Sequence, residues 1–316
     1  MHEKIFSVHK TVLLQETIDG LNLPVRVGGS ESIVVVDGTF GGGGHSAEIC
    51  KRYPQTKIIA IDQDKRAWKL AEHKFIDSKC DIVFINENFR NIDKVLKEKK
   101  IRQVDGIILD LGLSSDQLSS PADGSGRGFS FMKDEPLFMQ MKFSDKESHS
   151  EEDITAEEIV NDWSEETLAD IIYGYGEERY SRRIAKRIVE VRGKIRIKTT
   201  FDLVGIIESV VPNVYKRGKI HFATRTFQAL RIAVNDELGA LKEGLDKSFK
   251  FLKEGGRISV ITFHSLEDRI VKRFYKEKEK NGEARLINKK VITASEAELK
   301  NNPRSRSAKL RILSRL

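Results

Sequence analysis

Four short apolar runs, each ending at an acidic or turn residue, constrain the fold of this chain more than any other feature. The runs cover residues 32–38, 57–64, 81–89 and 105–113. Polar segments with helical spacing lie between them, such as AWKLAEHKF and IDKVLKEKK. Strands that alternate with helices indicate an α/β protein with a doubly wound, mostly parallel sheet. Ligands of such sheets bind at the carboxyl ends of the strands.

The alternation stops after residue 117 and resumes late in the chain. Residues 118–222 hold three of the six prolines and several helical segments without a buried strand. Strand patterns return at GRISVITF (256–263) and at SAKLRIL (307–313), where charges alternate with apolar residues as in an edge strand. We therefore predict a sheet domain formed by residues 1–117 and 223–316, with an inserted α-helical domain at 118–222.

A single apolar helix face is predicted after the insertion, because apolar residues recur there at steps of three and four. These residues are Phe227, Leu230, Val234, Leu238, Leu241 and Leu245.

The glycine-rich stretch DGTFGGGGHS (37–46) follows the first predicted strand. It lacks the Lys-Ser/Thr pair of a Walker A loop, which argues against a nucleotide triphosphatase. Gly42, Gly44 and Ala47 fit a GxGxxA dinucleotide pattern, and Asp62 lies at the spacing expected for a residue that binds ribose hydroxyls. That pattern alone is weak evidence, and a turn kept only for close packing is an alternative.

Asp37 stands at the mouth of this loop and favours one kind of cofactor. A carboxylate there would repel a pyrophosphate but attract the sulfonium and ammonium groups of S-adenosylmethionine. The loop therefore favours S-adenosylmethionine over NAD.

Charge, cysteine content and hydropathy indicate which kinds of partner this protein binds and in which compartment it acts. The net charge is +7 and the pI is about 9.2, with basic residues concentrated at 179–198 and 304–315. Such segments favour a polyanionic partner, although a solvated basic face is the alternative. Cys50 and Cys80 lie in no CxxC or Cys/His cluster, so we predict reduced thiols and no metal site. No apolar run is long enough to span a bilayer, which predicts a cytoplasmic protein without a membrane partner.

Several longer motifs resemble one family closely, in order from about residue 9 to the C-terminus. They include HKTVLLQET, DGTFGGGGHS, DGIILDLGLSSDQL, YGEERYSRRIAKRIV, ATRTFQALRIAVNDEL and NPRSRSAKLRI. The chain resembles the bacterial family of 16S ribosomal RNA cytosine-N4 methyltransferases, also called the MraW or RsmH family.

The resemblance implies a class I (Rossmann-like) methyltransferase fold, S-adenosylmethionine as methyl donor, and a cytidine in the decoding region (P site) of 16S ribosomal RNA as target. The RNA would be met within the small ribosomal subunit, and a homodimer is left open. The residues implied to contact the cofactor, together with Asp37, are Gly43, Gly44, His45, Asp62, Phe89, Asp110 and Gln117.

Three residues depart from the family pattern. Phe138 and Gln140 replace an acid and an arginine in the segment after RGFSF, and Phe222 replaces a proline before ATRTFQA. The first two changes affect RNA contacts by that segment rather than the cofactor site.

The acceptor atom is only partly indicated by the residues themselves. Methylation at C5 of a pyrimidine requires a cysteine nucleophile, and neither cysteine is expected at the active-site rim. The turn after the fourth strand, beginning at Asp110, lacks the Pro-Pro-aromatic signature of many amino methyltransferases. The N4 target therefore rests on the resemblance. Asp110 is a candidate to orient the amine or the cofactor, or else only a cap of the following turn.

His264 is a second catalytic candidate, since it follows a predicted strand and could face the target base. The alternative is structural, because Ser265 and Asp268 fit a capping box for the next helix.

Two basic segments are candidate RNA contacts. Ile184 and Ile188 predict a buried stripe on one helix, with basic residues on another side. The predicted RNA-binding residues are Arg182, Arg183, Lys186, Arg187, Arg304 and Arg306. A binding or assembly factor without catalysis, built on the same fold, is the alternative function.

Overall fold

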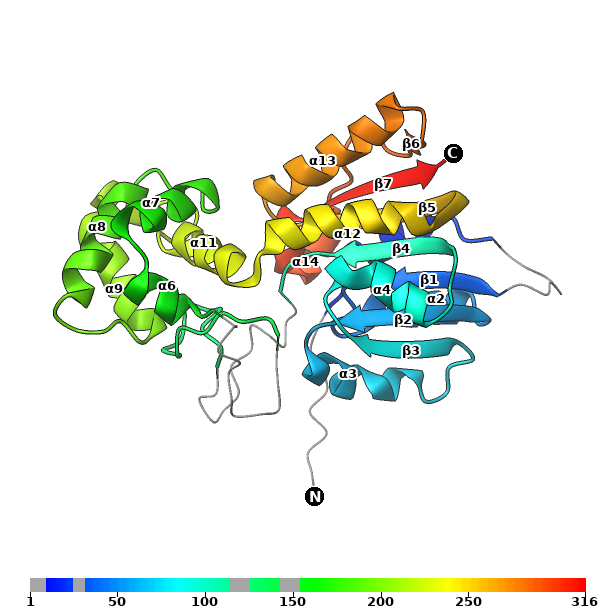
Figure 1. Cartoon of the computed structure of the whole chain (residues 1–316), viewed down its shortest axis with the longest axis horizontal. Helices are drawn as coiled ribbons and strands as arrows, with labels where there is room; N and C mark the ends of the chain where they lie inside the picture. The colour runs from blue at the N-terminus through cyan, green and yellow to red at the C-terminus, as the bar shows by residue number, and fades with distance from the viewer. Residues whose placement is uncertain (1–9, 25–31, 114–125, 143–153) are drawn as a thin grey trace, which may run out of the picture. The chain divides into compact units, whose positions relative to one another are not determined.

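The computed structural model describes residues 10–24, 32–113, 126–142 and 154–316. The chain divides into two compact units. Figure 1 shows the whole chain coloured by residue number. The first, which we call the sheet unit, comprises Met1–Asp116 and Leu238–Leu316, and the second, the helical unit, comprises Gln117–Glu237.

The sheet unit is built on one seven-stranded sheet with the order β3-β2-β1-β4-β5-β7-β6 (Figure 1). The strands are β1 (Ile33–Asp37), β2 (Thr56–Asp62), β3 (Asp81–Asn86), β4 (Val104–Asp110), β5 (Leu252–Thr262), β6 (Ala284–Leu286) and β7 (Lys309–Arg315). The first five strands are parallel, while β7 is antiparallel to both β5 and β6. The predicted α/β fold with a mostly parallel sheet is confirmed.

Both faces of this sheet are covered by helices, which is why its strands are continuous apolar runs. On one face, Val35 packs with α1 (Leu14–Leu21), α2 (Gly44–Arg52) and α3 (Lys65–Ala71). On the other, Val36 packs with α4 (Ile92–Glu98), α12 (Glu237–Phe251) and α13 (Ser265–Lys280). Neighbouring residues of one strand thus enter opposite cores.

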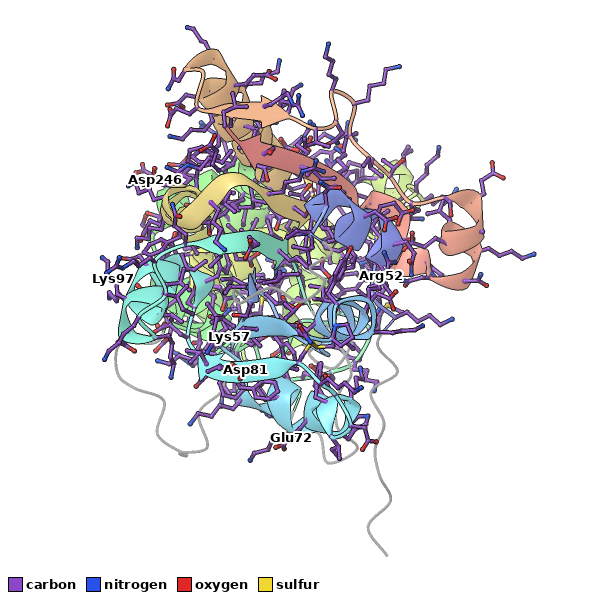
Figure 2. The ribbon with its side chains drawn as sticks, turned by 90° about the vertical axis from the view of Figure 1, so that its right-hand side faces the viewer. Arg52, Lys57, Glu72, Asp81, Lys97 and Asp246 are labelled. Carbon is purple, nitrogen blue, oxygen red and sulfur yellow. A yellow bond between two sulfur atoms is a disulfide. The ribbon has the colours of Figure 1, made fainter. Side chains whose placement is uncertain are left out.

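Strands β2 and β3 are joined by an ion pair as well as by backbone hydrogen bonds. Lys57 Nζ on β2 lies 3.1 Å from Asp81 Oδ2 at the start of β3, and both residues are labelled in Figure 2. Asp81 is exposed and Lys57 is partly exposed, so the contribution of this pair to stability is small.

The helical unit contains α6 (Ala156–Asp162), α7 (Glu165–Gly174), α8 (Ser181–Arg192), α9 (Thr200–Val210), α10 (Asn213–Lys216) and α11 (Thr224–Asn235). Helix α8 packs against α6, α7 and α9, and α11 packs against α6 and α7. Because α11 is packed there, the unit runs to Glu237 and not to the predicted boundary at residue 222. Among the helices of the described residues, none combines the length and apolarity needed to cross a membrane.

Two sequence predictions about secondary structure are wrong. The apolar face from Phe227 to Leu245 belongs to two helices, because the chain turns at Asp236, whose φ of 44° is left-handed. Strand β7 is an interior strand and not an edge strand, since β6 and an isolated bridge from Ile292 to Leu310 cover its far side.

The prediction of reduced cysteines is also wrong. Cys50 in α2 and Cys80 before β3 form a disulfide, with Cα atoms 5.5 Å apart. Helix α2 ends just before β2, and β3 pairs beside β2, so the fold brings together two residues that are distant in sequence.

Candidate functional site

Three aspartates end neighbouring strands and lie along one rim of the sheet. Asp37, Asp62 and Asp110 are the last residues of β1, β2 and β4. The register pairs Asp37 with Ala60 on one side and with Ile108 on the other. Asp62 and Asp110 each follow these partners by two residues, so their carboxylates lie about one pleat beyond that of Asp37. This rim is where open parallel sheets bind ligands.

Asp37 lies beneath the glycine loop and is only 1% exposed. Ser46 Oγ donates to its Oδ2 at 2.6 Å, and the Thr39 backbone N–H reaches its Oδ1 at 3.4 Å. Burial raises the pKa of the Asp37 carboxyl above its ordinary value. Asp37 therefore anchors the first turn of α2 to the end of β1 and does not stand open at the loop mouth.

Two glycines of the loop, Gly43 and Gly44, lie where a Cβ would collide with the side chains of Phe40 and Thr11. Gly43 is the N-cap of α2 and has a φ of 71°, which a side chain would strain. A Cβ on Gly43 would lie 2.7 Å from the Phe40 ring, and one on Gly44 would lie 1.7 Å from Thr11 Oγ1. Among the residues that the structure describes, no side chain caps this helix start, so its first backbone N–H groups can receive an anionic group such as a carboxylate.

Asp62 accepts two backbone hydrogen bonds that shape the loop next to it. Its Oδ2 accepts from Gly41 N at 2.7 Å, and its Oδ1 accepts from Asp64 N at 2.8 Å. Removal from water raises the pKa of Asp62 to about 6, against the opposing effect of these hydrogen bonds. Each carboxylate oxygen keeps a second lone pair that can accept from a hydroxyl.

His45 and Asp110 meet across the rim. His45 Nε2 lies 3.4 Å from Asp110 Oδ2, and the Asp110 backbone N–H donates to Thr39 Oγ1 at 2.6 Å. Within the described part of the chain, neither ring nitrogen of His45 nor Oδ1 of Asp110 has a hydrogen-bond partner. Buried polar atoms of this kind are costly unless a ligand completes them.

Phe89 begins the short helix η2 (Phe89–Asn91) after β3 and is half-buried. A Cβ on Gly244 would lie 2.5 Å from its ring, so α12 supports the ring from behind. Gln117, the other predicted cofactor contact, lies outside the described residues.

His264 is the N-cap of α13, and this differs from the predicted capping box. The box is formed by His264 and Glu267, one residue earlier than the predicted Ser265 and Asp268. His264 Nδ1 accepts from Glu267 N at 3.4 Å. Asp268 instead pairs with Arg311 on β7, at 2.7 Å from its Nε. The structural role of His264 is therefore visible, while its catalytic role stays a prediction.

The predicted basic face of α8 has the expected buried side. Ile184 and Ile188 are fully buried, whereas Arg182, Arg183 and Lys186 are exposed. Arg187 is half-buried and pairs with Glu190 at 3.2 Å. In the sheet unit, Arg304 and Arg306 are exposed on the short helix η3 (Pro303–Ser307).

The three departures from the family pattern lie in the helical unit. Phe222 is buried, with its ring centroid 4.2 Å from that of His221. The Phe138 carbonyl accepts from Ala156 N at 3.1 Å, and Gln140 Nε2 donates to the Ile154 carbonyl at 3.3 Å. Phe222 thus fills a packed position, and Gln140 makes a local contact within the unit.

Sequence reasoning missed Thr11, Thr39 and Ser46. Thr39 and Ser46 are the hydroxyl side chains of the glycine stretch, and a search for partners of buried carboxylates could have found them. Thr11 carried no signal, because it lies far from the loop in sequence.

Known proteins similar to this chain include one family and several individual relatives. The model of the MraW methylase family matches residues 6–316. A relative from Acetivibrio thermocellus, named ribosomal RNA small subunit methyltransferase H, is 46% identical over 98% of this chain and 99% of its own length. A relative of the same name from Clostridium botulinum strain Kyoto is 46% identical over 96% and 97%. A solved rRNA methylase from Streptococcus thermophilus is 10% identical, covers 90% of this chain and 87% of its own, and has a TM-score of 0.40.

Proposed function

The chain belongs to the MraW methylase family, and from this membership we propose that it methylates the N4 amine of a cytidine in the decoding region (P site) of 16S ribosomal RNA. Its methyl donor is S-adenosylmethionine. The observation that carries the proposal is the family match along nearly the whole chain, joined to an acidic rim at the ends of β1, β2 and β4.

The rim residues fit S-adenosylmethionine by their chemistry. Asp62 would accept from the ribose hydroxyls, because both of its oxygens keep lone pairs after binding Gly41 and Asp64. The uncapped N–H groups at the start of α2 would hold the methionine carboxylate. His45 and Asp110, whose buried polar atoms lack partners among the described residues, would complete the site, with Phe89 beside the adenine.

The cofactor supplies an activated methyl group, so the protein chiefly has to position the acceptor nitrogen. Transfer to an amine is an in-line displacement, for which alignment can supply much of the acceleration. Asp110 would orient the amine or the charged end of the cofactor through Oδ1, which has no hydrogen-bond partner among the residues that the structure describes. His264 is the second candidate to meet the base, although its side chain also caps α13.

The exposed basic residues of α8 and η3 would contact the RNA backbone. Arg182, Arg183 and Lys186 are exposed, so they are available for phosphates, although the Arg183 guanidinium also lies over the Tyr180 ring, 5.7 Å from its centroid. Arg187, Arg304 and Arg306 extend the set. An amine inside structured RNA must be unstacked before it can react, which favours an exposed loop in a cytoplasmic small ribosomal subunit as the substrate.

The test is incubation of the protein with labelled S-adenosylmethionine and unmodified small subunits, followed by nucleoside mass spectrometry. We expect the label in N4-methylcytidine alone. Label in another nucleoside, or no label, would overturn the proposal. Calorimetric titration with S-adenosylmethionine separates the enzyme from a non-catalytic assembly factor, which has no need of the cofactor.

A further inference from the structure

A buried leucine in an unusual backbone conformation precedes the first helix. Leu13 is fully buried, and its φ of 49° and ψ of 38° are left-handed. A bulky side chain rarely adopts this conformation unless the surroundings enforce it. The residue packs with Ile261, Leu310 and Ile312 beneath the sheet.

A distant helix binds this residue and the segment before it. Glu298 on α14 (Glu296–Asn301) accepts the Leu13 backbone N–H with Oε1 at 2.8 Å. Three residues earlier, Lys10 donates to the Asn301 carbonyl, and Asn302 Nδ2 donates to the Lys10 carbonyl, both at 3.1 Å. The segment 10–13 is therefore held at both ends by residues 298–302.

Between these two attachments lies Thr11, which abuts the start of the glycine-loop helix. Its Oγ1 and Cβ lie 1.7 and 3.0 Å from the position that a Cβ on Gly44 would occupy. Gly44 is the first residue of α2. The next two residues, His45 and Ser46, contact Asp110 and Asp37.

From this chain of contacts we propose that Glu298 is a positioning residue for the cofactor site. Its carboxylate holds Leu13 in the left-handed conformation, which seats Thr11 against Gly44 and fixes the first turn of α2. The inference rests on the proposed function, in which that turn holds the methionine end of S-adenosylmethionine. Glu298 itself touches none of the rim residues, so it acts only through Leu13 and Thr11.

Calorimetric titration of the full chain with S-adenosylmethionine tests this role. Glu298→Ala removes the acceptor and should weaken cofactor binding roughly tenfold, about the effect of one hydrogen bond to a charged group. Glu298→Gln keeps an oxygen at the same place and should restore binding close to that of the unchanged protein. Glu296→Ala, at an exposed position of the same helix, is the matched control and should leave binding unchanged.

Steady-state kinetics separate positioning from general damage. In Glu298→Ala the KM for S-adenosylmethionine should rise, while kcat and the KM for the RNA substrate stay near their original values. If Glu298→Ala does not fold, Thr11→Ala decides the question, because it opens the contact to Gly44 and leaves Glu298 in place. It should weaken cofactor binding in the same way.

The outcomes distinguish this inference from the function on which it rests. Unchanged cofactor affinity in a folded Glu298→Ala protein, or in Thr11→Ala, would overturn the positioning role. Equal weakening by Glu298→Gln and Glu298→Ala would also overturn it, because the acceptor oxygen would then not matter. An unchanged protein that does not bind S-adenosylmethionine would instead contradict the proposed function.

Discussion

His45 Nε2 lies 3.4 Å from Asp110 Oδ2, so the first turn of α2 and the end of β4 meet at one point of the rim. Both side chains are largely buried, and each carries a polar atom without a hydrogen-bond partner within the described residues. Because these two side chains lie close together and keep free hydrogen-bonding atoms among the described residues, a charged ligand bound beside them would change their protonation and hydrogen bonding.

Replacement of Asp110 by alanine is expected to lower kcat by roughly a hundredfold, the usual effect of losing one electrostatic or proton-handling group. Single-turnover kinetics with small subunits provide the measurement. Calorimetric titration with S-adenosylmethionine and circular dichroism are the controls for cofactor binding and folding. An Asp110→Ala protein that is folded and methylates at the original rate would remove Asp110 from the catalytic set.

The affinity for S-adenosylmethionine should fall as the pH is lowered through about 6. This value is the raised pKa of Asp62, and protonation removes acceptor capacity from the carboxylate. Titrations between about pH 5 and pH 8 measure the change, which spans roughly one unit on either side of that pKa. In Asp62→Asn the step centred near 6 should disappear. Asp37, whose pKa burial also raises, is present in both proteins, so a step that persists in Asp62→Asn would not belong to Asp62.

The stability of the cofactor-free protein should respond to the same group in the opposite direction. Because the pKa of Asp62 rises from 3.8 to about 6 on folding, the unfolded chain releases this proton at lower pH. The contribution of Asp62 to the free energy of unfolding therefore decreases as the pH rises from 3.8 to about 6. Denaturant unfolding of the original protein and Asp62→Asn across this window would reveal a difference; parallel profiles would contradict it.

Gly244→Ala should weaken cofactor binding, since the added methyl would lie 2.5 Å from the Phe89 ring and force it to move. Overpacking of this kind also lowers the free energy of unfolding by about 1–3 kcal/mol. Gly205→Ala in α9 is the matched helical control, because nothing lies within 4 Å of its added methyl. It should stabilise by about 0.5–1 kcal/mol. Titration and denaturant unfolding of both variants check this contrast.

Reversal of charge at Arg182 and Lys186, both to glutamate, should weaken RNA binding at least about tenfold. The slope of affinity against salt should decrease by about 1 for each lost phosphate contact. The same reversal at Lys94 and Lys99, exposed residues of the sheet unit, changes the net charge equally and should have little effect. Equal losses in the two double variants would point to net charge alone. Cofactor affinity should be unchanged throughout.

Cys80→Ser should lower the free energy of unfolding by about 3–4 kcal/mol without reductant, the expected effect of opening a loop of this size. The disulfide spans a sequence separation of 30 residues. With reductant present, the original and variant proteins should unfold alike. Titration of thiols in the unfolded, unreduced protein is the direct check, and two free thiols there would contradict the disulfide.

The sequence predicted the features that follow from local patterns. Strands β1, β2 and β4 were visible as the apolar runs 32–38, 57–64 and 105–113, which hold Asp37, Asp62 and Asp110 near their ends, so the acidic rim follows from the order of residues alone. Strand β6 was missed because three residues are too few to show a period. The helix break at Asp236 was missed because no glycine or proline marks it.

Contacts between distant segments could not be predicted in the same way. Nothing in the sequence brings Cys50 to Cys80, or Thr11 to Gly44, until β2, β3 and the segment before α1 are assembled. The reason for the glycines was therefore only partly predicted. Their flexibility was expected to admit a ligand, whereas the space beside Gly43 and Gly44 is filled by Phe40 and Thr11.

The position of β7 in the sheet affects how the protein folds during its synthesis. This strand lies between β5 and β6, although both of them precede it in the chain. As the chain leaves the ribosome, β6 has no neighbour in the sheet, and β5 lacks one of its two, until residues 309–315 have emerged. Pairings this late favour slow folding, since domains otherwise form from the N-terminal side during synthesis. The sheet that carries the rim is thus completed only once residues 309–315 have been translated.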